Sequence, residues 1–78
     1  MTPQLLDVVV LERDIPPQGL RRGDLGAVVE VYEPDHVAVE FVAASGRTQA
    51  LVTLRTSDLR AVSDTDLVSV RSMIESRA

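Results

Sequence analysis

Residues 19–32, with the sequence GLRRGDLGAVVEVY, decide the fold that the chain predicts. Gly23 and Gly26 lie on either side of an Asp-Leu pair, where glycine supplies a positive φ or room for close backbone approach. The β-branched run that follows, residues 27–33, is typical of a strand with one face toward the core and one toward water. We therefore expect a glycine-hinged loop that leads into the strongest strand of the molecule.

Further segments have the length and apolar composition of short strands. The first is residues 5–11, and the two prolines at 16 and 17 predict a wide loop after it, because proline cannot donate to a sheet ladder. The Pro34-Asp35 and Ser45-Gly46 pairs are typical of turns and bracket a strand around residues 37–41. The remaining strands are expected at residues 49–54 and 59–62, with a tight, 3₁₀-like turn between them.

Alternation of side chains assigns one face of each strand to the core. The register that keeps apolar residues together sets Phe41 opposite Ala50, and a three-residue loop after Glu33 sets Val31 opposite Val39. In the first strand we assign Asp7 to the solvent side. The residues then expected to face inward are Leu6, Val8, Val10, Leu25, Val29, Val31, Val39, Phe41, Val52, Leu54 and Leu59.

The last part of the chain, residues 63–78, changes in character. Ser63 followed by Asp66 resembles a capping box, which indicates a helix start. An apolar stripe at helical spacing follows, formed by Leu67, Val70, Met73 and Ile74. These features predict a C-terminal amphipathic helix over residues 63–78. Its stripe is expected either to pack across an open end of the same domain or to dock onto a second copy or another protein.

The layout predicts a mainly β protein. Five short strands, a wide loop after the first, hairpins between the middle three and a tight turn before the fifth match a small five-stranded SH3-like barrel with a C-terminal α-helix. We expect the barrel over residues 1–62 and the helix over residues 63–78. A closed sheet has no free edges, which suits a small all-β chain.

The chain also resembles a family of small bacterial proteins known as domain of unknown function 4926 (DUF4926). The resemblance lies in the Leu5–Val9 run, the Ile15-Pro16 pair, the Arg22-Gly23 pair followed by Gly26, and the Val28–Val31 run. It continues through Val39-Glu40-Phe41, Gly46-Arg47-Thr48, Leu51, Thr53-Leu54 and Leu59-Arg60. The resemblance implies an SH3-like barrel and no established activity. Residues 23–31 are also similar to the loop-strand motif of KOW-type modules in ribosomal and transcription proteins.

Composition limits the chemistry open to the chain. It has 78 residues, no cysteine and one histidine, which argues against disulfides and against a structural zinc site. The formal net charge of −4 argues against a nucleic-acid surface, although all eight basic residues are arginine. We see no signal peptide and no stretch of about 20 apolar residues that would span a membrane. A cytoplasmic protein is expected.

Few residues suggest a site. His36 is expected to be a turn residue in water rather than a base or a metal ligand, and Asp24 is expected to cap its turn. Arg21 and Arg22 are candidates for gripping a phosphate or a partner's carboxylate, with a solvated loop as the alternative. Tyr32 is the one aromatic left for the surface once Phe41 is assigned to the core. No catalytic residue, cofactor or metal is expected.

We expect a non-catalytic protein-interaction module, such as an adaptor, an accessory subunit or an antitoxin-like partner of a neighbouring protein. The partner would be another protein or a second copy of the chain. The alternative is a KOW-like nucleic-acid or ribosome-associated module that uses Arg21, Arg22 and Arg47. The residues expected to contact a protein partner are Arg21, Arg22, Tyr32, Leu67, Val70, Met73 and Ile74.

Overall fold

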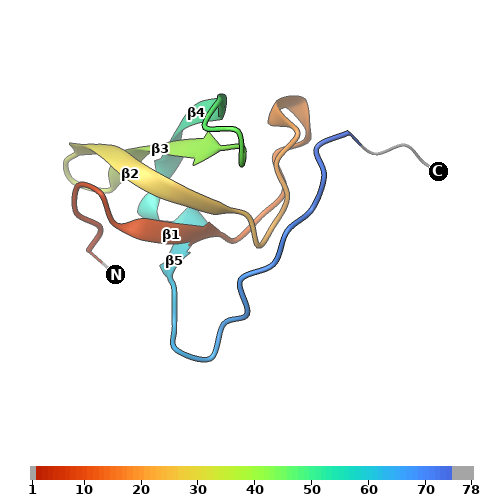
Figure 1. Cartoon of the computed structure of the whole chain (residues 1–78). Helices are drawn as coiled ribbons and strands as arrows, with labels where there is room; N and C mark the ends of the chain where they lie inside the picture. Colours follow the sequence, from red (N-terminus) through yellow and green to blue (C-terminus); the bar gives the residue numbers. More distant parts are fainter. Residues whose placement is uncertain (1, 75–78) are drawn as a thin grey trace.

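The computed structural model describes residues 2–74 and contains one five-stranded sheet (Figure 1). All neighbouring strands are antiparallel, in the order β4-β3-β2-β1-β5. The elements are β1 (Val8–Leu11), η1 (Pro16–Gln18), β2 (Leu25–Tyr32), β3 (His36–Val42), β4 (Thr48–Arg55), η2 (Thr56–Asp58) and β5 (Leu59–Ala61), where η marks a 3₁₀ turn. The prediction of a mainly β fold with five strands is confirmed.

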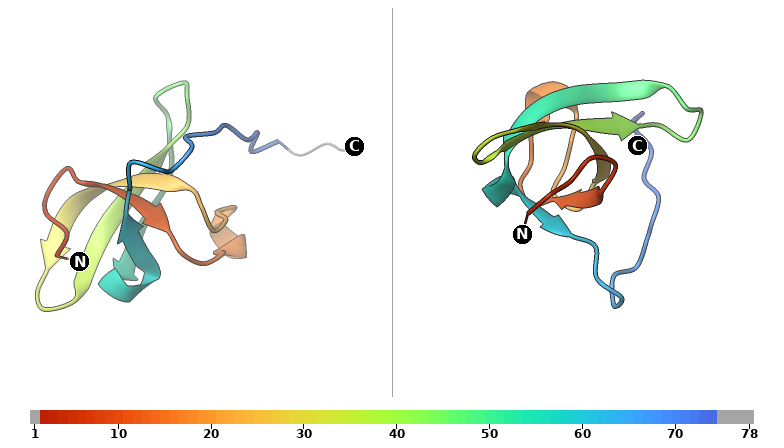
Figure 2. Two further views of the ribbon diagram at one scale, coloured as in Figure 1. Left: turned by 90° about the horizontal axis from the view of Figure 1, so that it is seen from below. Right: turned by 90° about the vertical axis from the view of Figure 1, so that its left-hand side faces the viewer.

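The sheet bends round on itself, with β1 and β5 on one side and β3 and β4 on the other (Figure 2). The core fills the concave side. The wide loop between β1 and β2 closes on it, because Ile15 and Leu20 exchange backbone hydrogen bonds and Leu20 is buried. The buried cluster is made of Val9, Leu11, Leu20, Val28, Val37, Val39, Phe41, Ala50, Leu54 and Leu59.

The predicted facing of β1 is wrong. Val9 and Leu11 are fully buried, whereas Val8 is 52% exposed and Leu6 is 78% exposed. The error comes from Asp7, which does not belong to the strand: its carboxylate accepts a hydrogen bond from the Gln4 N–H at 2.8 Å and closes a turn. A turn residue gives no information about which side chains of the following strand face the core. The assignment based on Asp7 is therefore shifted by one residue along β1.

The predicted facing of β2 fails for a different reason. The ladder between β2 and β3 slips at Val29, so that Val28 pairs with Val39 and Glu30 pairs with Ala38. Such a β-bulge inserts one unpaired residue and reverses the alternation beyond it. Val28 is therefore fully buried, and Val31 still packs against the core. The predicted pairing of Val31 with Val39 is wrong.

The hairpin between β3 and β4 has the predicted register. Phe41 pairs with Ala50 and Val39 pairs with Val52. Of the remaining predicted core residues, Leu54 and Leu59 are buried, but Leu25 is 37% exposed. Val10 is only 4% exposed, yet it lies on the outer face of the sheet, because its neighbours Val9 and Leu11 point into the core.

The predicted C-terminal helix is wrong over the described part of its range. Residues 63–74 contain no helix and run as an irregular, extended segment along one side of the sheet (Figure 1); residues 75–78 lie outside the described residues. The Asp66 carboxylate does accept the Ser63 N–H, as in a capping box, but it is also held by Arg60. β-branched residues such as Val68 and Val70 further disfavour a short helix.

Val9→Ala should lower the free energy of unfolding by about 2 kcal/mol, because it removes two buried methyl groups and leaves a cavity. The matched change Val8→Ala, on the exposed face of the same strand, should change it by less than about 0.5 kcal/mol. Urea denaturation followed by circular dichroism measures both values. Equal effects of the two substitutions would contradict the observed facing of β1.

Gly26→Ala should destabilise the fold by about 1–3 kcal/mol, because an added Cβ has no room. That atom would lie 2.5 Å from Val39 Cγ1 and 2.9 Å from Phe41 Cε2. Trimming the neighbour should relieve the clash, so Gly26→Ala combined with Val39→Ala should cost less than the sum of the two single changes. Additive costs in the same denaturation assay would show that the two residues are not in contact.

Candidate functional site

The described C-terminal segment, residues 62–74, is called the strap below. It leaves β5, turns back at residues 63–66 and passes along the side of the molecule toward the loop before β2 (Figure 1). The views in Figure 2 show it standing away from the sheet over much of its length. Two ion pairs attach it to the body of the molecule.

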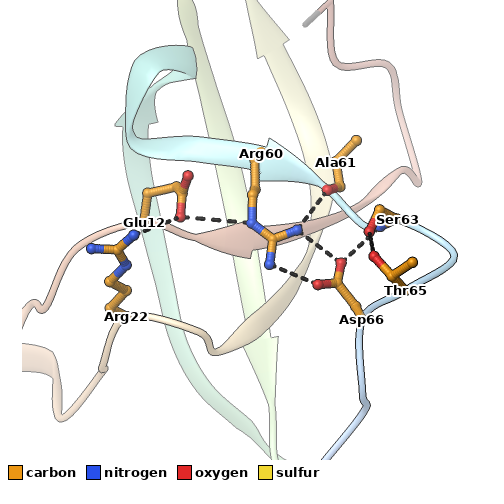
Figure 3. A network of polar contacts seen from close by, with 7 residues as sticks. All are labelled: Glu12, Arg22, Arg60, Ala61, Ser63, Thr65 and Asp66. Carbon is orange, nitrogen blue, oxygen red and sulfur yellow. Dashed lines mark hydrogen bonds and ion pairs between the residues drawn. The ribbon is translucent and has the colours of Figure 1, made fainter.

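The first attachment is a network around Arg60 (Figure 3). The Arg60 guanidinium donates two hydrogen bonds to Asp66, at 2.8 Å to Oδ2 and 3.0 Å to Oδ1, and Asp66 Oδ2 also accepts the Ser63 N–H at 2.7 Å. The Arg60 side chain further approaches Glu12, which in turn lies 3.8 Å from the Arg22 guanidinium. This network fixes the turn with which the strap begins.

The second attachment joins the far end of the strap to the loop before β2. Arg71 donates from Nε to Asp24 Oδ1 at 2.9 Å and from Nη2 to Asp24 Oδ2 at 2.6 Å, and it also donates to the Gly19 carbonyl at 2.9 Å. The side chains of Asp24 and Arg71 are 19% and 26% exposed. Asp24 caps its own turn as predicted, since Oδ2 accepts the Arg21 N–H at 2.8 Å. Two-pronged pairing of this kind is geometrically specific.

Both carboxylates are acidified by these contacts. Burial by itself would raise the pKa of Asp24, but the hydrogen bonds from Arg71 and from the Arg21 backbone outweigh burial, so the pKa lies below its ordinary value. The hydrogen bonds from Arg60 and then from Ser63 lower the pKa of Asp66 to about 2. The same contact with Asp66 raises the pKa of Arg60. Both attachments are therefore fully charged near neutral pH.

An open cleft of about 750 Å³ lies between the strap and the sheet. Its sheet side includes Val10, Leu25 and Val42, and its strap side includes Leu67, Val70 and Met73. Met73 also meets the loop, because its Cε lies 3.0 Å from the position that a Cβ on Gly19 would take. The lining of the cleft is thus mixed: apolar side chains predominate, but Gln49, Ser69 and the two ion pairs also face it.

The apolar side chains of the strap are mostly in solvent. Leu67 is 93% exposed and Val70 is 94% exposed, although each contributes to the rim of the cleft. Ile74 is 82% exposed, and Met73, at 37%, is the most covered of the predicted stripe. Large apolar side chains are thus exposed at several positions along the strap.

The structure brings together only some of the residues that we predicted to contact a partner. Arg22 lines the cleft together with Leu67, Val70 and Met73. Tyr32 ends β2 beside His36 and belongs to a different, smaller depression, so it does not join them. Arg21 and Ile74 do not line the cleft either.

Sequence reasoning missed the two arginines that hold the strap. Arg60 is separated from Asp66 by a turn, and the sequence around Asp66 predicts a helix-capping role for it instead. Arg71 pairs with a residue 47 positions away, and nothing local marks such a partner. The alternation of hydrophobic residues could have identified Val10 as an outer-face residue if the turn at Asp7 had been recognised.

His36 lies apart from the cleft, at the start of β3. Its Nδ1 is 2.9 Å from Asp35 Oδ1, and its side chain is 44% exposed. Within residues 2–74, no group of three or more histidine, cysteine or acidic side chains is placed to hold a metal ion. In the same range, no helix has the length and apolar character needed to cross a bilayer.

Acid should release the strap. A carboxylate whose pKa is lowered in the folded state stabilises that state above its unfolded pKa of about 3.8, and this contribution is lost as the pH falls through the folded value. We therefore expect the Arg60–Asp66 attachment to weaken between about pH 4 and pH 2, and the Arg71–Asp24 attachment to weaken as the pH falls below about 3.8. Titration followed by carboxyl ¹³C NMR measures the pKa of both aspartates.

Arg71→Gln should raise the pKa of Asp24 and leave that of Asp66 unchanged in the same titration. An unaltered pKa of Asp24 would contradict the second attachment.

Comparison with known proteins gives a family and no nearer relative. Neither the curated proteins nor the solved structures contain a match to this chain. A family model described as "Domain of unknown function (DUF4926)" matches residues 5–61, from the turn before β1 to the end of β5. The matched range covers the whole sheet and stops where the strap begins. The chain is therefore a member of the DUF4926 family.

Proposed function

We propose that the chain is a non-catalytic protein-interaction module, an SH3-like β-barrel that binds another protein through the side covered by the strap. It would serve as an adaptor, an accessory subunit or an antitoxin-like partner, in the cytoplasm. The observation that carries this proposal is the exposure of Leu67 and Val70, at 93% and 94%, next to an apolar cleft.

The assignment to an SH3-like barrel is supported by the connections between the strands. The last strand, β5, lies beside the first, β1, and is joined to β4 only by the 3₁₀ turn η2. A wide loop separates β1 from β2, and hairpin loops of three and five residues join β2 to β3 and β3 to β4. In a barrel of this size the interior is filled by side chains, so binding takes place on the outside.

The charges around the cleft support a role in binding rather than in catalysis. Asp24 is held by Arg71, and Asp66 is held by Arg60. A carboxylate whose pKa is lowered by an arginine is a poor general base near neutral pH, because it has little tendency to take up a proton. The ionisable groups of the cleft hold its two ends together and are not matched to proton transfer.

The same pairing favours a protein over a nucleic acid as the partner. Arg60 and Arg71, which line the cleft, are both bound to carboxylates. A phosphate backbone would have to displace those carboxylates and would also meet the acidic surface expected from a net charge of −4. Apolar side chains, by contrast, are available without breaking any contact.

The proposal is tested by capturing partners from the native host with the tagged full-length chain. A chain carrying Val70→Asp serves as the comparison, and Leu51→Asp is the matched control, because Leu51 is also exposed, at 63%, but lies on β4. A captured protein is then produced separately and titrated against the three chains by calorimetry.

We expect Val70→Asp to weaken binding at least about tenfold, because it places a charge in an apolar contact. Leu51→Asp should bind as the unmodified chain does. Equal binding by all three chains would show that the strap side is not the contact surface. The absence of any protein that binds the purified chain would overturn the proposed function.

A further inference from the structure

At the far attachment, the part of the body that receives the strap is held in place by its own contacts. Asp24 is held in place by the Arg21 N–H, and the neighbouring loop is closed by the backbone bonds between Ile15 and Leu20. Arg71 reaches this position across a separation of 47 residues in the sequence. Nothing in the contact requires that Arg71 and Asp24 belong to the same chain. The near attachment differs, because Arg60 and Asp66 are only six residues apart. They can stay paired whether the rest of the strap lies on its own chain or on another copy.

The middle of the strap lacks the contacts that would fix it to its own sheet. Among residues 2–74, no hydrogen bond joins Leu67, Val68, Ser69 or Val70 to another element. Three of these four residues are apolar, and two are β-branched valines, which favour extended strands. An extended segment with unpaired N–H and C=O groups is a template for pairing with another strand.

The strap and the surface that receives it are complementary in charge and in character. The strap contributes Asp66 and Arg71, and the body contributes Arg60 and Asp24. Both also contribute exposed apolar side chains, with Leu67 and Val70 on one and Leu25 and Val42 on the other. A surface that carries both halves of a contact can bind a copy of itself around a two-fold axis.

We propose that two copies of this chain exchange their straps. In the dimer, Arg71 of each copy binds Asp24 and the Gly19 carbonyl of the other copy, and residues 67–70 of the two straps lie antiparallel and pair as strands. Leu67 and Val70 then gain apolar neighbours that they lack in the single chain, where they are 93% and 94% exposed. This inference rests on the proposed role of the strap side in protein contact and identifies a second copy as its partner.

Reversing the charges of the far attachment tests the exchange. Asp24→Arg and Arg71→Asp each place like charges at this contact, whether the strap closes on its own chain or on a copy. When the two single variants are mixed, exchange of straps restores opposite charges at both contacts of a mixed dimer. Closure within one chain restores neither. The double variant Asp24→Arg, Arg71→Asp also loses the cap of the Asp24 turn, so it controls for that loss.

Native mass spectrometry and sedimentation of the purified full-length chains give the readout. We expect the unmodified chain and the double variant to form dimers, each single variant to be mainly monomeric, and the mixture to contain at least about tenfold more dimer than either variant alone. The two variants differ in mass, so the mixed dimer is identified directly. A mixture that stays monomeric overturns the exchange, and so does a dimer that persists unchanged in both single variants.

A second pair of variants keeps the test decisive if Asp24→Arg fails to fold. Val70→Asp should raise the dissociation constant of the dimer at least about tenfold, and Leu51→Asp should leave it unchanged. An equal response to both changes overturns the proposal. These measurements use the purified chain alone, so a negative result here together with capture of a foreign partner would refute the exchange and leave the proposed function standing.

Discussion

The close approach of β2 to β3 at Gly26 is the constraint on which the rest of the sheet depends. A methyl group at this position would overlap Val39 and Phe41, so only glycine lets β2 cross the core at this depth. Two residues further along, Val28 is fully buried, and the bulge at Val29 then turns the strand so that Val31 also packs against the core. Glycine and bulge together give a single short sheet the curvature that it needs to enclose ten buried residues.

The sequence predicted the number of strands, their order along the chain and the β3–β4 register, because these follow from local patterns: proline and glycine at the turns and alternation in between. It could not predict the facing of β1 or β2. In β1, Asp7 has the sequence context of a strand residue but closes a turn. In β2, a run of valines gives no sequence signal for the position of a bulge. In both places a shift of one residue exchanges the two faces, so a small local event overturns the whole assignment.

The prediction of a C-terminal helix failed for a broader reason. A stripe at helical spacing predicts a helix only if the helix has something to pack on, and short helices are marginal in water. Here the chain is drawn out between Arg60 and Asp24, two partners of the opposite sign that lie apart on the body. Only the first of these partners is near in sequence. The candidate surface could thus be predicted as apolar residues in the last quarter of the chain, but its cleft and its two attachments depend on contacts that only the fold creates.

The position of the strap depends on a balance between the entropy lost in holding it and the free energy of its contacts. Holding a residue in one backbone conformation costs about 1–2 kcal/mol in entropy, and residues 67–70 make no hydrogen bond to another element within the described chain to offset that cost. The pairing of Arg71 with Asp24 is partly buried and two-pronged, and a hydrogen bond to a charged group contributes about 1.5–3 kcal/mol. The free energy of this pairing is of the same order as, or smaller than, the entropic cost of ordering the four residues.

Burial of Leu67 and Val70 would add a further 1.5–3 kcal/mol for each side chain, at roughly 25 cal/mol per Å² of apolar area. The single chain does not obtain that contribution, because both side chains remain in solvent. The ion pairs therefore determine the position of the strap, and burial of its apolar side chains against a second surface would stabilise that position.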